Sequence, residues 1–254
     1  MESPVELPEA VTRRVREARS AVVLTGAGVS QESGLGTFRG PGGLWEEFRP
    51  EDLATPSAFR RAPATVWRWY AERWRWMAAA SPNPAHRALV RWPELFPSFT
   101  LVTQNIDRLH QRAGSAEVLE LHGTLAIARC SECGGRREMD AALELPGEPP
   151  RCECGGPLRP DVVWFGELLP PEPMERAVSA CRRCDLFLAV GTSATVFPAA
   201  GLIEVAHDAG ACVVEVNPEE TAFSRLAQLR LAAAAGAVLP ALTEAFAACR
   251  SPRS

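Results

Sequence analysis

An apolar run leads into a glycine turn at Ala21-Val22-Val23-Leu24-Thr25-Gly26-Ala27-Gly28. The first five of these residues are mostly apolar, and several are β-branched. A short continuous run of this kind is typical of a strand that is buried on both faces of a parallel sheet. We therefore predict a buried strand over 21–25 whose carboxyl end opens into a glycine-containing loop.

Similar apolar runs recur further along the chain, and each ends in a polar or glycine-containing loop. The runs are 99–103, 118–121, 186–190 and 211–216, and the loops that follow them are 104–107, 122–123, 191–193 and 217–219. Helical stretches separate several of these runs, which predicts an α/β fold with a parallel sheet. Ligands of such sheets bind outside the carboxyl ends of the strands, so we expect these loops to meet at one crevice.

Two regions interrupt this pattern. Residues 50–92 are rich in tryptophan, alanine and arginine and contain no strand-like run, which predicts a helical insertion. Residues 129–160 hold four cysteines among many glycines and prolines. A segment with so few apolar residues cannot build its own core and usually needs a metal ion to fold.

The four cysteines have the spacing of a metal site. Cys130-x2-Cys133 and Cys152-x-Cys154 are 18 residues apart, and a Gly-Gly pair follows each of them. Two close pairs of thiolates suit one tetrahedral, structural zinc ion with no open coordination position. The second pair is one residue shorter than the usual C-x2-C, so a degenerate knuckle that folds without metal is the alternative.

The remaining cysteines favour a different interpretation. Cys181-x2-Cys184 lies where a helix runs into the strand 186–190, a place that presents two thiols poorly to one metal ion. We predict that Cys181 and Cys184 are buried thiols, and that Cys212 and Cys249 are core positions.

Composition limits the class of protein. The chain has 254 residues, 46% of them hydrophobic and 23% charged, with a formal net charge of −4. This acidic balance argues against a general nucleic-acid-binding surface, and no apolar segment is long enough for a membrane helix. The N-terminal residues lack the basic start and apolar core of a signal peptide, so we expect a cytoplasmic protein. All 27 basic residues are arginine, which codon bias explains better than avoidance of self-modification.

Six motifs occur in an order and spacing that resemble the sirtuin family. They are GAGVSQESGLGTFR at 26–39, TQNIDRLH at 103–110, LHG at 121–123 before the four-cysteine module, RPDVVWFGE at 159–167, GTS at 191–193 and VNPE at 216–219. The glycine loop alone is a weak sign of dinucleotide binding, because it lacks the full G-x-G-x-x-G pattern. One departure is Thr37, where the family commonly has an acidic residue. A threonine there points to the bacterial and mitochondrial deacylase branch.

The resemblance implies a Rossmann-like parallel-sheet domain with an inserted smaller zinc-binding and helical domain. We expect the Rossmann-like, NAD-binding domain to be discontinuous, over 11–45, 94–122 and 161–250. The helical insertion would then be 46–93 and the zinc-binding module 123–160. NAD, as a consumed co-substrate, and an acyl-lysine peptide would lie in the cleft between the two domains.

The resemblance also assigns residues to NAD. Gly26, Ala27 and Gly28 would line the pyrophosphate, and Gln104, Asn105 and Asp107 would hold the nicotinamide ribose and carboxamide. The full set expected to bind NAD is Gly26, Ala27, Gly28, Ser30, Thr37, Phe38, Arg39, Trp45, Gln104, Asn105, Ile106, Asp107, Gly191, Thr192, Ser193, Asn217, Pro218, Glu219 and Ala235.

The chemistry that the family implies assigns catalysis to His122, Asn105 and Asp107. The acyl oxygen of the substrate displaces nicotinamide from the ribose, and His122 then acts as general base on a ribose hydroxyl. A histidine suits this role because its unperturbed pKa lies near working pH. The products are nicotinamide, free lysine and O-acyl-ADP-ribose. A single histidine at a strand end is otherwise more often a core residue, and we expect only structural hydrogen bonds from His110.

The acyl group is indicated by Tyr70 and Arg73, which share one face if this region is helical. A guanidinium and a phenol together form a receptor for a carboxylate, and Tyr-x-x-Arg here resembles the sirtuins that remove succinyl and malonyl groups. An aromatic and arginine-rich helix surface is the alternative. Val163, Phe165, Gly166 and Glu167 lie in a segment, 163–167, that resembles the strand pairing with the substrate peptide.

Other functions compete with lysine deacylation. A protein mono-ADP-ribosyltransferase would use the same NAD site with another acceptor, and labelled ADP-ribose would then become protein-bound. A non-catalytic binding module is disfavoured by the intact Asn105, Asp107 and His122. A dehydrogenase is disfavoured because no acidic residue ends a clear strand about 20 positions past the glycine loop. We expect acyl-lysine proteins or peptides as partners, no nucleic acid or membrane, and a monomer.

Overall fold

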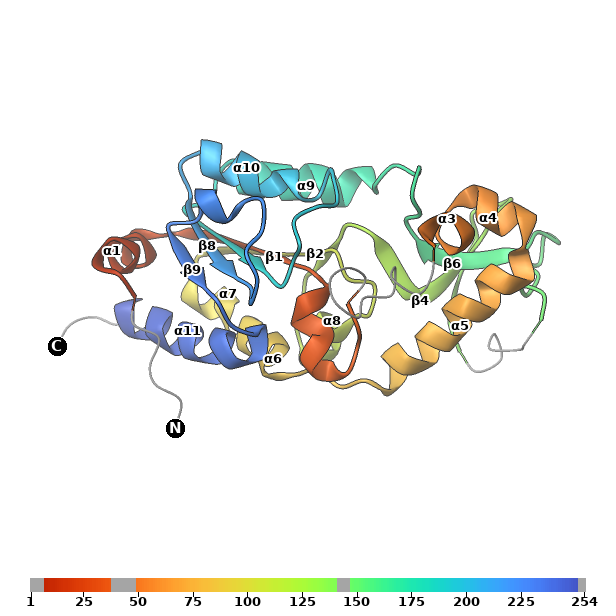
Figure 1. Cartoon of the computed structure of the whole chain (residues 1–254), viewed down its shortest axis with the longest axis horizontal. Helices are drawn as coiled ribbons and strands as arrows, with labels where there is room; N and C mark the ends of the chain where they lie inside the picture. The colour runs from red at the N-terminus through yellow and green to blue at the C-terminus, as the bar shows by residue number, and fades with distance from the viewer. Residues whose placement is uncertain (1–6, 38–48, 141–146, 251–254) are drawn as a thin grey trace.

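The computed structural model describes residues 7–37, 49–140 and 147–250. They form two parts that lie side by side (Figure 1). The larger part is a parallel sheet with helices on both faces, and the smaller part combines three antiparallel strands with the helices α3, α4 and α5.

The large sheet has six described strands in the order β3-β2-β1-β7-β8-β9, all parallel. The strands are β1 (Ser20–Thr25), β2 (Ser98–Thr103), β3 (Leu119–Glu120), β7 (Leu186–Val190), β8 (Cys212–Val216) and β9 (Leu229–Leu231). All five predicted runs form strands of this sheet, which confirms the predicted α/β fold. The edge strand β9 is only half-buried and was not predicted.

Strand β1 is buried on both faces, as its continuous apolar run predicted. Val23 packs into a core with α1 (Glu9–Glu17), α6 (Pro84–Val90), α7 (Trp92–Leu95) and α11 (Ala235–Arg250). Val22 and Leu24 point the other way, toward α9 (Pro171–Cys181) and α10 (Gly201–Asp208). Successive side chains of a strand alternate between faces, so one apolar run serves both cores.

The small part joins the helical insertion to the cysteine module. Its sheet has the order β5-β4-β6, with β4 (Gly123–Cys130), β5 (Arg136–Glu138) and β6 (Leu158–Val162). Helices α3 (Pro50–Leu53), α4 (Pro56–Arg61) and α5 (Pro63–Ala79) lie beside this sheet (Figure 1). Trp67 of α5 is buried against Cys130 and Leu158, so the two sequence regions share one core.

The packing revises two of the expected boundaries. Ala85, Leu89 and Trp92 belong to the core of the large sheet, although sequence analysis grouped them with the insertion 46–93. The sequence does not reveal whether the buried side of each helix in 46–93 faces the core of the large sheet or the core of the small part. Residues 161–162, grouped with the large domain, are the end of β6 in the small sheet.

The strand order defines where a ligand can bind. The chain passes from β1 to β2 on one side and later returns to β7 on the other side of β1. A crevice opens at the carboxyl ends of such a pair, where the order of strands reverses. The short helices η1 (Ala27–Ser33), α8 (Leu109–Ala113) and η3 (Ser224–Leu226) follow β1, β2 and β8 near this edge.

Among the described helices, none combines the length and apolar character needed to cross a membrane.

Candidate active site

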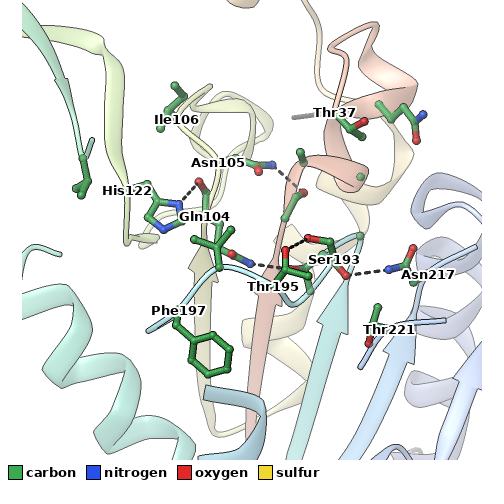
Figure 2. A pocket seen from close by; sticks show the side chains of 18 of the residues that line it. Thr37, Gln104, Asn105, Ile106, His122, Ser193, Thr195, Phe197, Asn217 and Thr221 are labelled. Carbon is green, nitrogen blue, oxygen red and sulfur yellow. Dashed lines mark hydrogen bonds between the residues drawn. The ribbon is translucent and has the colours of Figure 1, made fainter. Parts of the chain in front are cut away.

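A cavity of about 830 Å³ lies at the carboxyl ends of β1, β2, β7 and β8 and extends to the small part of the molecule. Figure 2 shows His122, Gln104, Asn105, Thr195 and Asn217 arranged around it. The loops that follow the predicted strands therefore meet at one crevice, as expected. Residues of α5 and of the segment after β6 complete the wall on the side of the small sheet.

Most of the predicted site residues line this cavity. They are Gly26, Ala27, Gly28, Thr37, Tyr70, Arg73, Gln104, Asn105, Ile106, His122, Val163, Phe165, Gly166, Glu167, Gly191, Thr192, Ser193, Asn217, Pro218, Glu219 and Ala235. Ser30 and Asp107 line a smaller cavity of about 50 Å³ that shares four residues with the large one: Ala27, Arg73, Asn105 and Ile106. Phe38, Arg39 and Trp45 lie outside the described residues.

The glycines of the first loop are required by backbone packing. A Cβ atom on Gly28 would lie 2.8 Å from the Cα atom of Gly191, and one on Gly26 would lie 2.7 Å from the oxygen of Gly191. The N–H groups of Gly26 and Gly28 donate to the carbonyl oxygens of Val190 and Gly191, at 3.0 and 2.8 Å. These two N–H groups are therefore used within the protein, and the glycines bring the ends of β1 and β7 together.

His122 follows β3 and points toward the second loop. Its Nδ1 atom lies 2.9 Å from the carbonyl oxygen of Gln104. A carbonyl oxygen can only accept, so Nδ1 carries the proton and the lone pair of the neutral ring is on Nε2. Burial lowers the pKa of His122, and the bond to Gln104 opposes this shift in part. The imidazole is therefore neutral near pH 7, with Nε2 able to accept a proton.

Asn105 and Asp107 are joined through Ser30. The amide of Asn105 donates to the Ser30 hydroxyl at 3.1 Å and to the carbonyl oxygen of Gly26 at 3.1 Å. Ser30 donates to one Asp107 oxygen at 2.7 Å, and the backbone N–H of Leu109 donates to the other at 2.9 Å. Burial raises the pKa of the Asp107 carboxyl, and these donors lower it. The network ties the loop after β2 to the loop after β1.

Two histidines lie behind this network. His86 is 3.5 Å from the Ser30 hydroxyl through Nε2, and its Nδ1 accepts from the backbone N–H of Asn83. His110 bonds through Nε2 to the Thr25 hydroxyl at 3.0 Å. Burial lowers the pKa of His86 to about 4 and that of His110 to about 3, so both rings are neutral. The expected structural role of His110 is confirmed, whereas sequence analysis assigned no role to His86.

Tyr70 and Arg73 both lie on the cavity side of α5, as their spacing predicted. Tyr70 is 5% exposed and Arg73 is 4% exposed. The guanidinium carbon of Arg73 is 3.4 Å from the centroid of the Trp69 ring. The phenol oxygen of Tyr70 accepts a hydrogen bond of 3.0 Å from the indole nitrogen of Trp164. A phenol and a guanidinium thus lie together at one end of the cavity.

The segment 163–167 is not a strand in this structure, because β6 ends at Val162 and a turn follows at Phe165. The N–H of Val163 donates to the carbonyl oxygen of His122, and that of Phe165 to the carbonyl oxygen of Ala54. These two hydrogen bonds hold residues 163–165 in place without forming a strand pair. The predicted β-pairing with a peptide thus stays a prediction for Val163, Phe165, Gly166 and Glu167.

The opposite end of the cavity is closed by the loop after β8. Asn217 donates from its amide to the carbonyl oxygen of Thr192 at 2.8 Å, and Gln104 donates to the Thr192 hydroxyl at 2.9 Å. Buried Glu215 accepts from the hydroxyls of Thr221 and Ser224 at 2.7 and 2.5 Å. The carboxylate of Glu215 therefore folds residues 217–224 back over the end of β8.

Sequence analysis missed a further set of lining residues. They are Gln31, Ala54, Val162, Trp164, Leu169, Thr195, Val196, Phe197, Pro198, Val216, Glu220, Thr221, Ala222 and Ala234. Gln31, Val162, Trp164 and Val216 lie inside motifs that were recognised but were not assigned a role, and others directly continue a motif, such as 191–193 or 216–219. Ala54 carries no signal of its own, because its place in the wall depends on how α3 packs.

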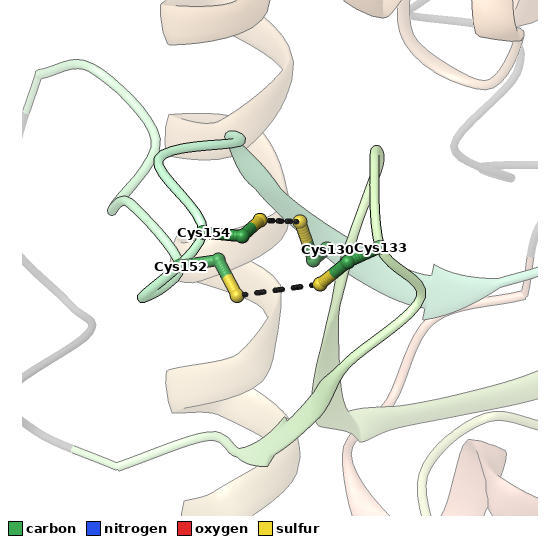
Figure 3. A group of neighbouring side chains, drawn as sticks. All are labelled: Cys130, Cys133, Cys152 and Cys154. Carbon is green, nitrogen blue, oxygen red and sulfur yellow. Dashed lines mark hydrogen bonds between the residues drawn. The ribbon is translucent and has the colours of Figure 1, made fainter.

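The four cysteines of the small part converge, as predicted (Figure 3). Their sulfur atoms all lie within 4.8 Å of one another, with Cys130 and Cys154 3.5 Å apart and Cys133 and Cys152 3.6 Å apart. Tetrahedral zinc with Zn–S bonds of about 2.3 Å needs sulfurs roughly 3.8 Å apart, so the cluster fits one zinc ion. Backbone N–H groups of Cys133 and Glu132 lower the pKa of Cys130 to about 6, which favours the thiolate.

The rival pair is confirmed as buried thiols. Cys181 and Cys184 are 0% and 5% exposed, and burial raises the pKa of both well above the usual range. Cys212 is in the core, as predicted, but Cys249 is only half-buried because it lies near the end of α11.

The parallel sheet and the cavity at the carboxyl ends of β1 and β7, where the order of strands reverses, define a nucleotide-binding α/β protein with a Rossmann-like fold. Residues 26–198 match the model of the Sir2 family. The chain belongs to the Sir2 family, and the four-cysteine cluster is its zinc-binding module.

Known relatives agree with this assignment. An NAD-dependent protein deacylase of Aquifex aeolicus is 52% identical over 84% of this chain and 89% of its own length. One of Thermus thermophilus is 50% identical over 89% of this chain and 90% of its own. The crystal structure of a Sir2 homolog–NAD complex superimposes with a TM-score of 0.90 at 42% identity, over 99% of this chain and 98% of that one. A Sir2 complex with a deacetylated peptide and 3'-O-acetyl ADP-ribose gives 0.86 at 33% identity, over 93% and 97%.

Proposed function

We propose that this protein removes acyl groups from lysine side chains of other proteins and consumes NAD in the reaction. The observation that carries this function is His122, a neutral, half-buried imidazole that lines the cavity beside the loop 104–107 and whose Nε2 lone pair can take a proton. The names of the relatives, NAD-dependent protein deacylases, support the same activity and do not favour ADP-ribosyl transfer to protein.

The cavity fits NAD as the co-substrate. It is lined by Ala235 and the loop 217–222, by the glycine loop, and by Asn105 and Ile106, which are the groups of residues expected to bind adenosine, phosphates and nicotinamide ribose. When bound, NAD supplies the ribose carbon that accepts the acyl oxygen and the hydroxyl that later attacks. The chain contributes orientation through Asn105 and Asp107, and a proton acceptor at Nε2 of His122.

The zinc ion has a structural role in this proposal. Its four thiolate ligands leave no open position for substrate, and the site lies between β4 and β6, whose other ends border the cavity. The cysteine cluster thus holds the sheet from which the segment 163–167 emerges.

We also propose that the acyl group carries a carboxylate, as succinyl and malonyl do. Tyr70 and Arg73 line the cavity at the end where the substrate side chain would enter. A guanidinium binds a carboxylate in two-point fashion, and a phenol adds one more donor. Both side chains are already buried and fixed in place, so little conformational freedom is lost on binding.

The activity is tested by following nicotinamide release with acetyl- and succinyl-lysine peptides, with and without NAD. His122→Ala is expected to keep the fold and the zinc and to lose NAD-dependent acyl removal. His207→Ala is the matched control, because His207 is only half-buried on α10, does not line the cavity and, among the described residues, makes its side-chain pairing with Asp208. Near-normal turnover by His122→Ala would overturn the assignment.

The acyl preference is tested by the double substitution Tyr70→Phe and Arg73→Met. It should reduce desuccinylation by roughly a hundredfold or more and deacetylation far less, because a buried carboxylate without its donors is strongly disfavoured. Equal losses on the two peptides would refute a role in acyl selection.

A cytoplasmic monomer is the state that we propose. None of the eight cysteines forms a disulfide, which suits a reducing compartment. Light scattering after size exclusion should give the mass of one chain, 27.5 kDa, and a dimer mass would contradict the proposal.

A further inference from the structure

Trp164 is a buried side chain at the acyl end of the cavity. It lies in the motif 159–167, but sequence analysis gave its side chain no role of its own. It is 2% exposed and lines the cavity between the end of β6 and the turn at Phe165. Its backbone N–H donates to a carboxylate oxygen of Glu167 at 2.9 Å. The ring of Phe59 lies against the indole, with centroids 5.4 Å apart. Together with the bond to Tyr70, contacts from α4, α5 and the turn at Phe165 thus surround the Trp164 side chain.

Arg159 lies over the indole ring of Trp164. The guanidinium carbon lies 3.4 Å from the centroid of the Trp164 ring. The same guanidinium makes two parallel bonds to Glu167, of 2.5 and 2.9 Å, and a third to the carbonyl oxygen of Val162. Arg159 is 6% exposed, so this pairing is shielded from solvent. Bidentate pairing fixes the guanidinium plane, and the plane in turn fixes the indole.

The bond between Trp164 and Tyr70 has only one possible polarity. An indole N–H can donate but not accept, so the phenol oxygen of Tyr70 is the acceptor of the 3.0 Å bond. The phenol keeps its own proton, because burial raises its pKa above the ordinary value. Within the described part of the chain, no side chain or carbonyl accepts that proton. It is therefore left for a group that enters the cavity, which Tyr70 lines.

We propose that Trp164 is a specificity-determining residue that holds the Tyr70 phenol as a hydrogen-bond donor toward an acyl carboxylate. A phenol hydrogen lies near the ring plane, in one of two positions on either side of the C–O bond. The indole N–H occupies the lone pair on one side, so the proton takes the other. A carboxylate gains a preoriented donor, whereas the methyl group of an acetyl chain gains nothing. This inference rests on the proposed function, since it names what selects the acyl group.

The test compares Trp164→Phe with the unaltered protein on succinyl- and acetyl-lysine peptides, following nicotinamide release with saturating NAD. The substitution removes the N–H and keeps an aromatic ring. We expect kcat/KM for the succinyl peptide to fall about fivefold to tenfold, the usual effect of one hydrogen bond, with less than about a twofold change for acetyl. In a Tyr70→Phe background the same substitution should leave the ratio of the two rates unchanged.

Two controls separate orientation from packing. Trp92→Phe removes an indole bond of similar length, 2.9 Å to Thr243, in the core of the large sheet, and should leave the succinyl-to-acetyl ratio unchanged. Should Trp164→Phe fail to fold, benzothienylalanine placed at position 164 retains the bicyclic shape and lacks only the N–H. This variant should lower the succinyl-to-acetyl ratio, as Trp164→Phe should.

The outcomes distinguish this inference from the function on which it rests. An unaltered protein that releases no nicotinamide with either peptide overturns the proposed activity, and one that prefers the acetyl peptide overturns the acyl preference. In both cases this inference fails with them. An unchanged succinyl-to-acetyl ratio in Trp164→Phe, whether neither rate falls or both fall equally, overturns the role of Trp164 alone.

Discussion

Replacing Gly28 by alanine should force the ends of β1 and β7 apart. A Cβ atom at this position would lie 2.8 Å from the Cα atom of Gly191, 2.9 Å from its oxygen and 3.1 Å from its carbonyl carbon, whereas ordinary contact begins at 3.4 Å. All three neighbours are backbone atoms, so no flexible side chain can move aside. Gly28 has no positive φ, and the conformation itself therefore tolerates alanine. Steric overlap is the only penalty expected.

The size of this penalty follows from overpacking in a well-ordered interior, which typically costs about 1 to 3 kcal/mol. In a chain of this length each kcal/mol lowers Tm by about 2 to 4 °C, so we expect a decrease of roughly 2 to 12 °C. Moving the ends of β1 and β7 apart also displaces the loop that would meet the NAD phosphates. Affinity for ADP-ribose should therefore fall by more than the loss of folding stability explains.

Thermal unfolding followed by circular dichroism, and calorimetric titration with ADP-ribose, measure the two effects. Gly36→Ala is the matched control, because a Cβ atom there meets none of the described residues within 4 Å and Gly36 has no positive φ. It should leave Tm unchanged or raise it slightly. A Gly28→Ala protein that unfolds within about 1 °C of the control, with unaltered ADP-ribose affinity, would refute the packing argument.

Two further outcomes follow from the buried histidines and the cysteine cluster. His86 and His110 have folded-state pKa values of about 4 and about 3, below the unfolded value of about 6.5, so stability is full above pH 6.5 and should fall as pH drops from there toward 4. Urea unfolding measures this, and constant or rising stability between pH 7 and pH 5 would contradict it. Zinc chelation should remove hydrogen-exchange protection from β4 to β6 while the large sheet stays protected. Cys152→Ser should lose the zinc and Cys184→Ser keep it, as metal analysis can check.

The large sheet was predictable because each central strand is a continuous apolar run. Burial on both faces, as in β1, favours apolar residues at nearly every position, and the loops that follow such runs must lie at one edge. Strand β9 escaped prediction because an edge strand that is half-buried needs no such run. The small part was predicted as two regions, whereas Trp67 and Cys130 share one core. No local pattern shows that contact, since it depends on how α5 lies across β4.

The site residues were predictable where side-chain chemistry is local to a motif, and less so where a contact joins distant elements. His122 and the loop 104–107 stand at strand ends and lie together in the cavity. The contacts of His86 with Ser30 and of Trp164 with Tyr70 form only through tertiary packing, at sequence distances of 56 and 94. The glycine loop shows a third case. Its motif was recognised from the sequence. Only the structure shows that Gly26 and Gly28 must be glycines because a Cβ atom on either would overlap the backbone of Gly191.

The proposed base, His122, and the proposed acyl receptor, Tyr70, are oriented in the same way. Each makes a hydrogen bond to a partner that can only accept or only donate, and this bond decides whether the side chain accepts or donates toward the cavity. The Gln104 carbonyl oxygen only accepts, so His122 presents a lone pair, and the Trp164 indole only donates, so Tyr70 presents a proton. Neither partner titrates near neutral pH, so neither assignment depends on a nearby charge. Because the two partners lie on different elements, the loop after β2 and the segment after β6, a substitution at Trp164 can change acyl choice while His122 stays poised as base.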